Sequence, residues 1–448
     1  MTDIRRYIEE VYTKVQARDP QQPEFLQAVR EFFNTIEPVL VKYPELIKQN
    51  ILERIVEPER IIQFSVPWVN DQGEVEVNRA FRVQFNSAIG PYKGGLRFHP
   101  TVNQSIIKFL GFEQTFKNSL TGLPIGGGKG GSDFDPKGKS DGEIMRFCQS
   151  LMNELQKYIG SSMDIPAGDI GVGAREIGYL YGQYKRLNGS ENGAITGKHL
   201  LYGGSLGRKE ATGYGLVYFT KAMLEDAGKS IKGQKVIVSG SGNVAIYTME
   251  KIKECEGIVI ACSDSTGYII DESGIDVELI KDLKEVKRER ISEYVNIRPE
   301  ASYYPGNVWN HRITYHIALP CATQNEINKD SAATIIANGV FAVAEGANMP
   351  TDLEGTIMFR KAGILFGPAK AANAGGVAVS ALEMSQNSQR RCWTSYEVDN
   401  ELKKTMENIY GQIRNVAREY GVEGDFVAGA NMAAFTKVAF AMEFQGVV

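Results

Sequence analysis

The stretch "GQKVIVSGSGNVAIYTMEKIKECEGIVIACSDSTGYI", residues 233–269, decides the fold of this chain. It reads as a β-branched strand, a glycine turn, a helix and a second apolar strand. Gly240, Gly242 and Ala245 give the GxGxxA form of the dinucleotide-binding fingerprint. The first glycine permits a tight turn, the second lets the backbone approach a pyrophosphate, and the small third residue lets helix and strand pack closely. Because the pattern stands between a strand and a helix, we expect a Rossmann-like βαβ unit.

The rest of the chain places this unit in the second of two domains. Strand-like segments follow it, "ITYHIALP", "GVFAVAEGA" and "GILFGP", as a doubly wound α/β sheet requires. Before it lie helices up to about residue 58, then two β-rich segments joined by the turn "NDQG", then further helices. We expect an α/β fold with a substrate-binding and assembly domain over 1–203, an NAD(P)-binding Rossmann-like domain over 204–426, and a cleft between them. Residues 427–448 read as one more helix.

Composition excludes several classes of function. The chain has 448 residues, a formal net charge of −4 and 23% charged residues, so no basic field suggests nucleic-acid binding. No apolar run is long enough to span a bilayer, and the N-terminus mixes Arg, Asp and Glu, unlike a targeting peptide. Five dispersed cysteines and four histidines form no metal or disulfide pattern, which indicates reduced thiols and a cytoplasmic protein. Lysine and aspartate remain as candidate acid–base groups.

A second glycine-rich stretch, "LPIGGGKGGSDFDP" at residues 123–136, surrounds Lys129 with five glycines in six residues. A phosphate-binding loop is excluded, because Gly130 follows the lysine where a hydroxyl residue is needed and Leu123 occupies the place of the first glycine. Two interpretations stay open. The stretch is either a flexible turn with a solvated lysine at its tip, or a segment in which a ligand and the backbone approach an amine closely.

Three lysines and one aspartate stand in unusual settings. Lys93 precedes two glycines, Lys129 is flanked by them, and Lys117 shares a helix face with Gln114. Three converging amines suit a multiply anionic substrate, and their mutual repulsion lowers at least one pKa, which favours Lys129 as an acid–base group. Asp169, in "IPAGDIGVG", is the matching acid; the alternative is a turn or cap residue.

Five motifs together resemble one family. "GPYKGGLRFHP", "LPIGGGKGGSDFDP", "DIPAGDIGVGAREIGYL", "SGSGNVA" and "KAANAGGVAVSALEMSQN" closely resemble the hexameric glutamate dehydrogenases, in the short form near 450 residues. The resemblance runs from about residue 50 to the C-terminus, in the family's motif order. These enzymes belong to a superfamily that also acts on leucine, valine and phenylalanine.

The resemblance implies a role for most of these residues. Lys129 is the catalytic amine, which stabilises charge on the substrate oxygen and activates the water that hydrolyses the imine. Asp169 moves protons to and from the amino nitrogen. Gln114 and Lys117 hold the α-carboxylate, with the backbone of Gly168 nearby. The resemblance also implies domain closure, a homohexamer of two stacked trimers, and a C-terminal helix that packs back on the first domain.

By the same resemblance, Lys93 and Ser380 grip the side-chain carboxylate, while Thr212, Asn243 and Asn373 contact the cofactor. Relatives that act on apolar amino acids carry apolar residues in place of Lys93 and Ser380. A buried lysine facing an apolar side chain would be an unpaired charge, at a cost of several kcal/mol in rough terms. Lys93 therefore favours a dicarboxylic substrate, and the expected reaction is the reversible oxidative deamination of L-glutamate to 2-oxoglutarate and ammonium.

Residues after the second strand of the βαβ unit bear on the choice between NAD and NADP. Asp264 there favours NAD, because an acid at this place accepts a hydrogen bond from a free ribose 2′-hydroxyl. Ser265 beside it, with Lys287 and Arg290 in "KEVKRERISEY", resembles NADP-preferring members and favours a 2′-phosphate. The alternative is that these charges form a solvated helix face. We expect NADP to be preferred, with some use of NAD.

Two other functions stay open. A dehydrogenase for an apolar amino acid is disfavoured by Lys93 and Ser380, and a catalytically dead dinucleotide-binding subunit is disfavoured by Lys129 and Asp169. Neither a metal, a nucleic acid nor a membrane is expected as a partner.

Overall fold

The computed structural model describes residues 3–448, which form two compact units. Unit 1 comprises the chain up to Leu206 together with Val377–Val398 and Asn431–Val448, and unit 2 comprises Gly207–Gly376 and Asp399–Ala430. No helix within the described residues is long and apolar enough to cross a membrane. Three helices contain residues of both units: α15 (Gly375–Gln389), α16 (Ser395–Glu419) and α17 (Phe426–Gln445).

Unit 1 is built on a five-stranded sheet in the order β1-β2-β4-β3-β5. The hairpin of the first two strands turns at "NDQG", as the sequence predicted. β2 pairs antiparallel with β4, whereas β4, β3 and β5 run parallel. The strands are β1 (Arg60–Val69), β2 (Val75–Asn86), β3 (Tyr92–Phe98), β4 (Gly127–Ser132) and β5 (Asp164–Gly168).

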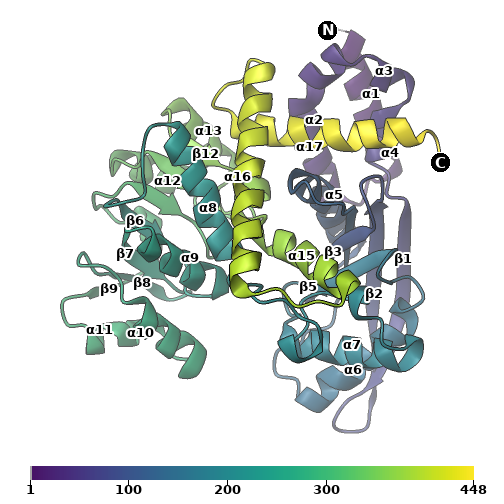
Figure 1. The fold of residues 1–448 in the computed structure, drawn as a ribbon, viewed down its shortest axis with the longest axis horizontal. Helices are drawn as coiled ribbons and strands as arrows, with labels where there is room; N and C mark the ends of the chain where they lie inside the picture. Colours follow the sequence, from purple (N-terminus) through teal and green to yellow (C-terminus); the bar gives the residue numbers. More distant parts are fainter. Residues whose placement is uncertain (1–2) are drawn as a thin grey trace. The chain divides into compact units, whose positions relative to one another are not determined.

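Helices cover both faces of this sheet (Figure 1). On one face α6 and α7 enclose a core in which the rings of Phe134 and Phe147 stack at 3.8 Å. On the other face α5 and α2 meet through Phe32 and Phe116, stacked at 4.2 Å, and Phe435 of α17 joins them. The helical segments of unit 1 are α1 (Asp3–Arg18), α2 (Pro23–Lys42), α3 (Glu45–Lys48), α4 (Ile51–Ile55), α5 (Gln104–Leu120), α6 (Asp141–Leu155), α7 (Ala174–Asn188), η1 (Asn192–Ala194) and η2 (Leu200–Tyr202).

The glycine-rich stretch around Lys129 is a buried interior strand, β4, so the interpretation as a flexible turn with a solvated lysine is wrong. Its glycines are required by the closeness of the neighbours. A Cβ on Gly127 would lie 1.9 Å from Thr115 Oγ1 of α5, and a Cβ on Gly131 would lie 2.3 Å from the carbonyl oxygen of Arg97. These glycines let strands and a helix approach one another. The close approach of a ligand to this backbone, which the sequence predicts, stays a prediction.

Unit 2 contains a seven-stranded sheet in the order β12-β11-β10-β6-β7-β8-β9. β12, β11, β10, β6 and β7 are parallel, which confirms the predicted Rossmann-like α/β sheet. The antiparallel pair β8 and β9 extends it at one edge and was not predicted. The strands are β6 (Lys235–Val238), β7 (Ile258–Ser263), β8 (Gly267–Ile270), β9 (Ser302–Pro305), β10 (Ile317–Leu319), β11 (Ala342–Ala344) and β12 (Leu365–Gly367).

The order of strands reverses at β6, whose neighbours β7 and β10 lie on opposite sides of it, and ligands of such sheets bind at this point. One face of the sheet packs on α8 and α9, and the other on α12 and α13 around buried Trp309 (Figure 1). The helical segments of unit 2 are α8 (Ala211–Asp226), α9 (Asn243–Glu254), α10 (Val277–Lys281), η3 (Asp282–Val286), η4 (Ile291–Glu293), α11 (Tyr294–Ile297), η5 (Val308–Asn310), α12 (Lys329–Ala337), α13 (Leu353–Lys361) and α14 (Ala369–Ala372).

Candidate active site

Three neighbouring strands of unit 1 bring Lys129, Asp169 and Arg97 together. Lys129 is on β4, Arg97 is on β3, and Asp169 directly follows β5, which is the next strand in the sheet. Asp169 Oδ2 accepts from Arg97 Nε at 2.8 Å and lies 3.1 Å from Lys129 Nζ. Gly95 leaves room beside the amine, because a Cβ there would lie 3.3 Å from Lys129 Nζ. The sequence predicted the lysine and the aspartate but missed Arg97, whose only signal was its place in "KGGLRFHP".

The pKa values of both Lys129 and Asp169 are lowered in this cluster. Burial lowers the pKa of Lys129, and the charges of Arg97 and Arg82 act in the same direction against the attraction of Asp169. Burial raises the pKa of Asp169, but Lys129 and Arg97 outweigh it and bring that pKa to about 2. The sequence predicted the lowered pKa of Lys129. The responsible charges, however, are arginines and not the other two lysines.

Arg82 lies on β2 opposite Gly130 of β4, and the sequence did not predict it as a residue of this site. Its side chain is fully buried, pairs with Asp164 through Nε at 2.8 Å, and donates from Nη1 to the carbonyl oxygen of Gly94 at 3.0 Å. It thus runs from β2 past β4 to β3 and β5. A Cβ on Gly130 would lie 3.0 Å from Arg82 Cδ, so this glycine also makes room for the guanidinium chain. The signal in the sequence was an arginine inside the apolar strand pattern "AFRVQF".

Lys93 and Ser380 meet through a third residue, Thr196. Lys93 is 1% exposed, and its Nζ donates to Thr196 Oγ1 at 2.6 Å and to the carbonyl oxygen of Ile165 at 3.0 Å. Thr196 Oγ1 lies 3.0 Å from Ser380 Oγ of α15. The chain of hydroxyls therefore joins residues 93, 196 and 380. Thr196 was missed because "NGAITGKHL" carries no motif that distinguishes a functional threonine from a loop threonine.

Gln114 and Lys117 lie on α5, one turn apart, as predicted. Gln114 Nε2 donates to Asn118 Oδ1 at 2.6 Å. Asn118 Nδ2 in turn donates to the backbone oxygens of Lys93 and Gly126, at 3.0 and 2.6 Å. Asn118 thereby ties this face of α5 to β3 and to the segment before β4.

Gly168 ends β5 next to Asp169, and it packs so closely that an added Cβ would lie 2.5 Å from the carbonyl oxygen of Val172. Every predicted substrate residue thus belongs to unit 1.

The residues predicted for the cofactor belong to unit 2. Gly240 has φ +87°, which explains the glycine in the turn after β6, and its N–H donates to Ser263 Oγ at 2.8 Å. Gly242 caps α9 without a side-chain hydrogen bond, and a Cβ there would meet nothing within 4 Å. Open space and unsatisfied N–H groups at a helix N-terminus fit a pyrophosphate. Asn243 begins α9 and donates from Nδ2 to the carbonyl oxygen of Lys209 at 2.6 Å.

Two further predicted residues lie elsewhere in unit 2. Asn373 caps α14 and donates from Nδ2 to Asn348 Oδ1 at 2.9 Å. Thr212, in the first turn of α8, lies against Gly376, where an added Cβ would be 2.6 Å from its Oγ1.

Asp264 follows β7 as predicted, but its carboxylate is engaged by its own neighbourhood. Oδ1 accepts from the backbone N–H and the hydroxyl of Thr266, and Oδ2 accepts from the N–H of Ile291 at 3.2 Å. Its side chain is 5% exposed. Burial acts to raise its pKa, but these hydrogen bonds outweigh burial and lower it. The carboxylate is therefore a structural acceptor that fastens two loops.

Ser265 and Arg290 lie together beside this carboxylate, with Arg290 Nη1 3.9 Å from Asp264 Oδ2. Arg290 Nη1 donates to Ser265 Oγ at 2.7 Å, and the arginine side chain is 56% exposed. Lys287 lies apart from them, with its Nζ 2.8 Å from Asp282. Lys287 and Arg290 lie in the loop after η3 and not on a helix face, and their side chains are 45% and 56% exposed.

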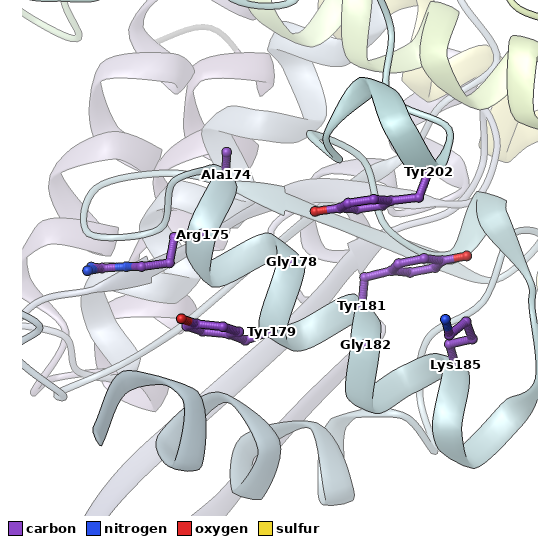
Figure 2. A pocket seen from close by; sticks show the side chains of 8 residues that line it. All are labelled: Ala174, Arg175, Gly178, Tyr179, Tyr181, Gly182, Lys185 and Tyr202. Carbon is purple, nitrogen blue, oxygen red and sulfur yellow. The ribbon is translucent and has the colours of Figure 1, made fainter. Parts of the chain in front are cut away.

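A shallow pocket of about 430 Å³ lies elsewhere in unit 1, along α7, and contains none of the predicted site residues. Figure 2 shows the rings of Tyr181 and Tyr202 side by side at its wall, stacked at 5.7 Å, with Gly178 and Gly182 on the helix between the side chains. No group of metal-ligating side chains occurs within residues 3–448.

Comparison with known proteins agrees with this arrangement. Residues 203–446 match the family described as "Glutamate/Leucine/Phenylalanine/Valine dehydrogenase", and residues 58–186 match "Glu/Leu/Phe/Val dehydrogenase, dimerisation domain". The NADP-specific glutamate dehydrogenase of Escherichia coli (strain K12) is 55% identical over 447 residues, which cover 98% of this chain and 99% of that protein.

Two further relatives are similar to this chain over nearly its whole length. The NAD(P)-specific glutamate dehydrogenase of Xylanibacter ruminicola is 55% identical over 445 residues, 98% of this chain and 99% of that one. The crystal structure of Plasmodium falciparum glutamate dehydrogenase superimposes with a TM-score of 0.97 at 51% identity, over 99% of this chain and 96% of that chain. On the sequence matches and the shared fold, the chain belongs to the Glu/Leu/Phe/Val dehydrogenase family.

Proposed function

We propose that this chain catalyses the reversible oxidative deamination of L-glutamate to 2-oxoglutarate and ammonium, with NADP as the preferred cofactor. The observation that carries the proposal is the pair of buried clusters in unit 1. Lys129, with its lowered pKa, lies on the ionised Asp169, and Lys93 is joined through Thr196 to Ser380. Glutamate dehydrogenases with 55% identity over nearly the whole chain support the same reaction.

Lys129 is assigned the acid–base role. Burial lowers the pKa of this amine, which favours its uncharged form more than in an exposed lysine, and the uncharged amine can accept a proton from water and return it to the substrate oxygen. As an ammonium it stabilises the negative charge that develops on that oxygen. Asp169 is assigned the transfer of protons at the amino nitrogen. Its pKa of about 2 keeps it ionised before substrate enters, ready to accept.

Lys93, Thr196 and Ser380 are assigned to the side-chain carboxylate of the substrate. The contacts of Lys93 Nζ with Thr196 and Ile165 are to neutral oxygens, so a substrate carboxylate would add a charge-assisted hydrogen bond. Two hydroxyls beside the ammonium supply further donors. An apolar substrate side chain would give none of these bonds, which is why the reading as a dehydrogenase for apolar amino acids ranks second. Gln114, Lys117 and the backbone of Gly168 are assigned to the α-carboxylate.

The cofactor is assigned to unit 2. Gly240, Gly242, Asn243, Thr212 and Asn373 would hold it, and when bound it supplies the hydride acceptor or donor of the reaction. The preference for NADP rests on the loop after β7. Because Asp264 is engaged by Thr266 and Ile291, the groups left for the ribose are Ser265 and Arg290, which suit a 2′-phosphate. Lys287 is kept as a further candidate.

Assembly, location and motion complete the proposal. A homohexamer is proposed from the family resemblance, with support from the match of residues 58–186 to a dimerisation domain. A cytoplasmic location is proposed from the five cysteines, all of which are free. Closure of a cleft between the two domains, at the boundaries given by the sequence, stays a prediction.

The decisive experiment is the initial rate of NADPH and of NADH oxidation with ammonium and 2-oxoglutarate, beside a matched assay with 2-oxoisocaproate. Turnover confined to 2-oxoglutarate and faster with NADPH is expected. Turnover of 2-oxoisocaproate would reject the assignment of Lys93 and Ser380, and no turnover would favour the dead binding subunit. Lys129→Ala is the control, and it should lose at least about a hundredfold in kcat, the usual contribution of one acid–base group.

A further inference from the structure

Three polar residues form a row on one face of α15. Ser380, Glu383 and Asn387 are spaced by three and four positions, so their side chains lie one above another along the helix. Each contacts the same segment of unit 1, residues 195–203. Ser380 meets Thr196, and the other two residues have no part in the reaction as described above.

Glu383 holds the backbone directly after Thr196. Its Oε2 accepts from the N–H of Gly197 at 2.9 Å. Its Oε1 accepts from Lys198 Nζ at 2.7 Å and from the N–H of Lys198 at 3.4 Å. Both charged side chains are completely buried. One carboxylate therefore fixes two successive peptide units and one side chain.

Lys198 closes the arrangement from the other side. Its ammonium donates to the carbonyl oxygen of Ile195, to Glu383 and to Asn387 Oδ1, which uses all three of its N–H groups. Asn387 Nδ2 donates to the carbonyl oxygen of Gly203 at 2.7 Å. The backbone on both sides of Thr196 is thus bound to one ion pair.

A buried ion pair is an inefficient way to stabilise a fold, because desolvation of the two charges offsets most of their attraction. A well-packed apolar pair would stabilise the fold equally well, so the ion pair indicates that a nearby group must be held in a fixed position. The group next to the ion pair is Thr196. The Thr196 hydroxyl must remain 2.6 Å from Lys93 Nζ and 3.0 Å from Ser380 Oγ, while its N–H donates to the carbonyl oxygen of Pro166.

We propose that Glu383, Lys198 and Asn387 are positioning residues that hold the Thr196 hydroxyl between Lys93 and Ser380, and thereby set the preference for a dicarboxylic substrate. The inference rests on the proposed function, since it deepens the assignment of the side-chain carboxylate site. It predicts that loss of the pair lowers activity toward 2-oxoglutarate but spares a substrate that lacks the distal carboxylate.

The test measures kcat/KM for 2-oxoglutarate and for 2-oxovalerate, which has the same carbon chain without the second carboxylate, and compares their ratio. The variant is Lys198→Met with Glu383→Gln, which removes both charges together and leaves neither buried alone. We expect the ratio to fall at least about tenfold, the loss of one charge-assisted hydrogen bond. An unchanged ratio, or an equal loss for both substrates, would overturn the proposal.

A matched control removes a different buried lysine–carboxylate pair of unit 1, between Lys108 and Asp19, whose Nζ and Oδ2 are 2.9 Å apart. Lys108→Met with Asp19→Asn should leave the ratio unchanged, and a fall of the same size would show that any lost pair has this effect. A second comparison uses Thr196→Val. If the ion pair acts through Thr196, removing the pair in a Thr196→Val background should lower the ratio no further than Thr196→Val alone. Additive losses would contradict the proposal.

Two outcomes are separated by design. Wild-type enzyme that shows no preference for 2-oxoglutarate would refute the proposed function itself, before any variant is made. If the double variant does not fold, Asn387→Ala decides, because it removes one bond to Lys198 and leaves both charges in place. A several-fold fall in the ratio supports the positioning role, and an unchanged ratio overturns it.

Discussion

A single methyl group added to a glycine should have opposite effects in β4 and in α7. In Gly127→Ala the new Cβ would lie 1.9 Å from Thr115 Oγ1 and 2.6 Å from the backbone α-carbon of Thr115, whereas real Cβ atoms essentially never approach another atom closer than 3.0 Å. In Gly182→Ala the new Cβ meets nothing within 4 Å, and the glycine is exposed on the helix.

The magnitudes follow from these distances. Overpacking costs about 1–3 kcal/mol, and Gly127 belongs at the upper end, because part of the collision is with backbone that no rotamer change can relieve. Gly182→Ala should instead stabilise α7 by about 0.5–1 kcal/mol, the helix penalty of glycine relative to alanine. The two variants should thus differ by about 4 kcal/mol, although each adds one methyl group.

Hydrogen exchange measured by mass spectrometry gives the assay, because it reports the opening of each segment separately. In Gly127→Ala the amides of β4 and of its partner β2 should exchange about a hundredfold faster, while peptides of β6 in unit 2 serve as an internal control. Adding Thr115→Ala should not restore protection, since the collision with the backbone of residue 115 remains. Wild-type exchange in Gly127→Ala, or rescue by Thr115→Ala, would refute the packing argument.

Three further predictions concern charges. Arg97→Met should raise the pKa of Lys129, because the charge of Arg97 lowers that pKa. The ascending limb of the profile of kcat/KM against pH should then move to higher pH, and Arg97→Lys, which keeps the charge, should leave the limb in place. An unmoved limb in the Met variant would contradict this. Arg290→Ala, which removes the donor beside Ser265, should raise KM for NADPH about tenfold and KM for NADH less than twofold; equal effects would reject the 2′-phosphate assignment. Burial raises the pKa of Glu345 to about 7. The protonated carboxyl therefore stabilises the folded state by about 3 kcal/mol below pH 4.5, and this contribution is lost as the pH rises to 7. The difference in unfolding free energy between wild type and Glu345→Gln should fall by this amount over that range, and a constant difference would exclude the titration.

The Rossmann-like sheet of unit 2 was predictable because its signals are local. The turn at Gly240 needs φ +87°, and glycine at such a place after "KVIVS" is visible in the sequence. The antiparallel strands β8 and β9 were missed, since "GYII" and "SYYP" are too short to show a period. Lys129 and Asp169 were found from their unusual neighbours, whereas Thr196 and Arg97 were not.

The strand β4 shows why pattern reading has a limit. Five glycines are typical of a loop, but here they form a strand whose neighbours, α5, Arg82 and the adjacent strands, lie too close for most side chains. Those neighbours are distant in the sequence, so their closeness has no local signature. A long-range packing constraint can reverse the structure that local propensity favours.

The close packing around the glycines of β4 has a consequence for anyone who wishes to change what this enzyme accepts. Gly127, Gly130 and Gly131 leave no room for a Cβ, so the strand that carries the amine is closed to redesign. The residues around Lys93 have the opposite character, because the Thr196 hydroxyl contacts that amine and the Ser380 hydroxyl, from a separate element, contacts Thr196. A library meant to alter specificity would therefore leave the glycine strand untouched and vary positions 93, 196 and 380 together.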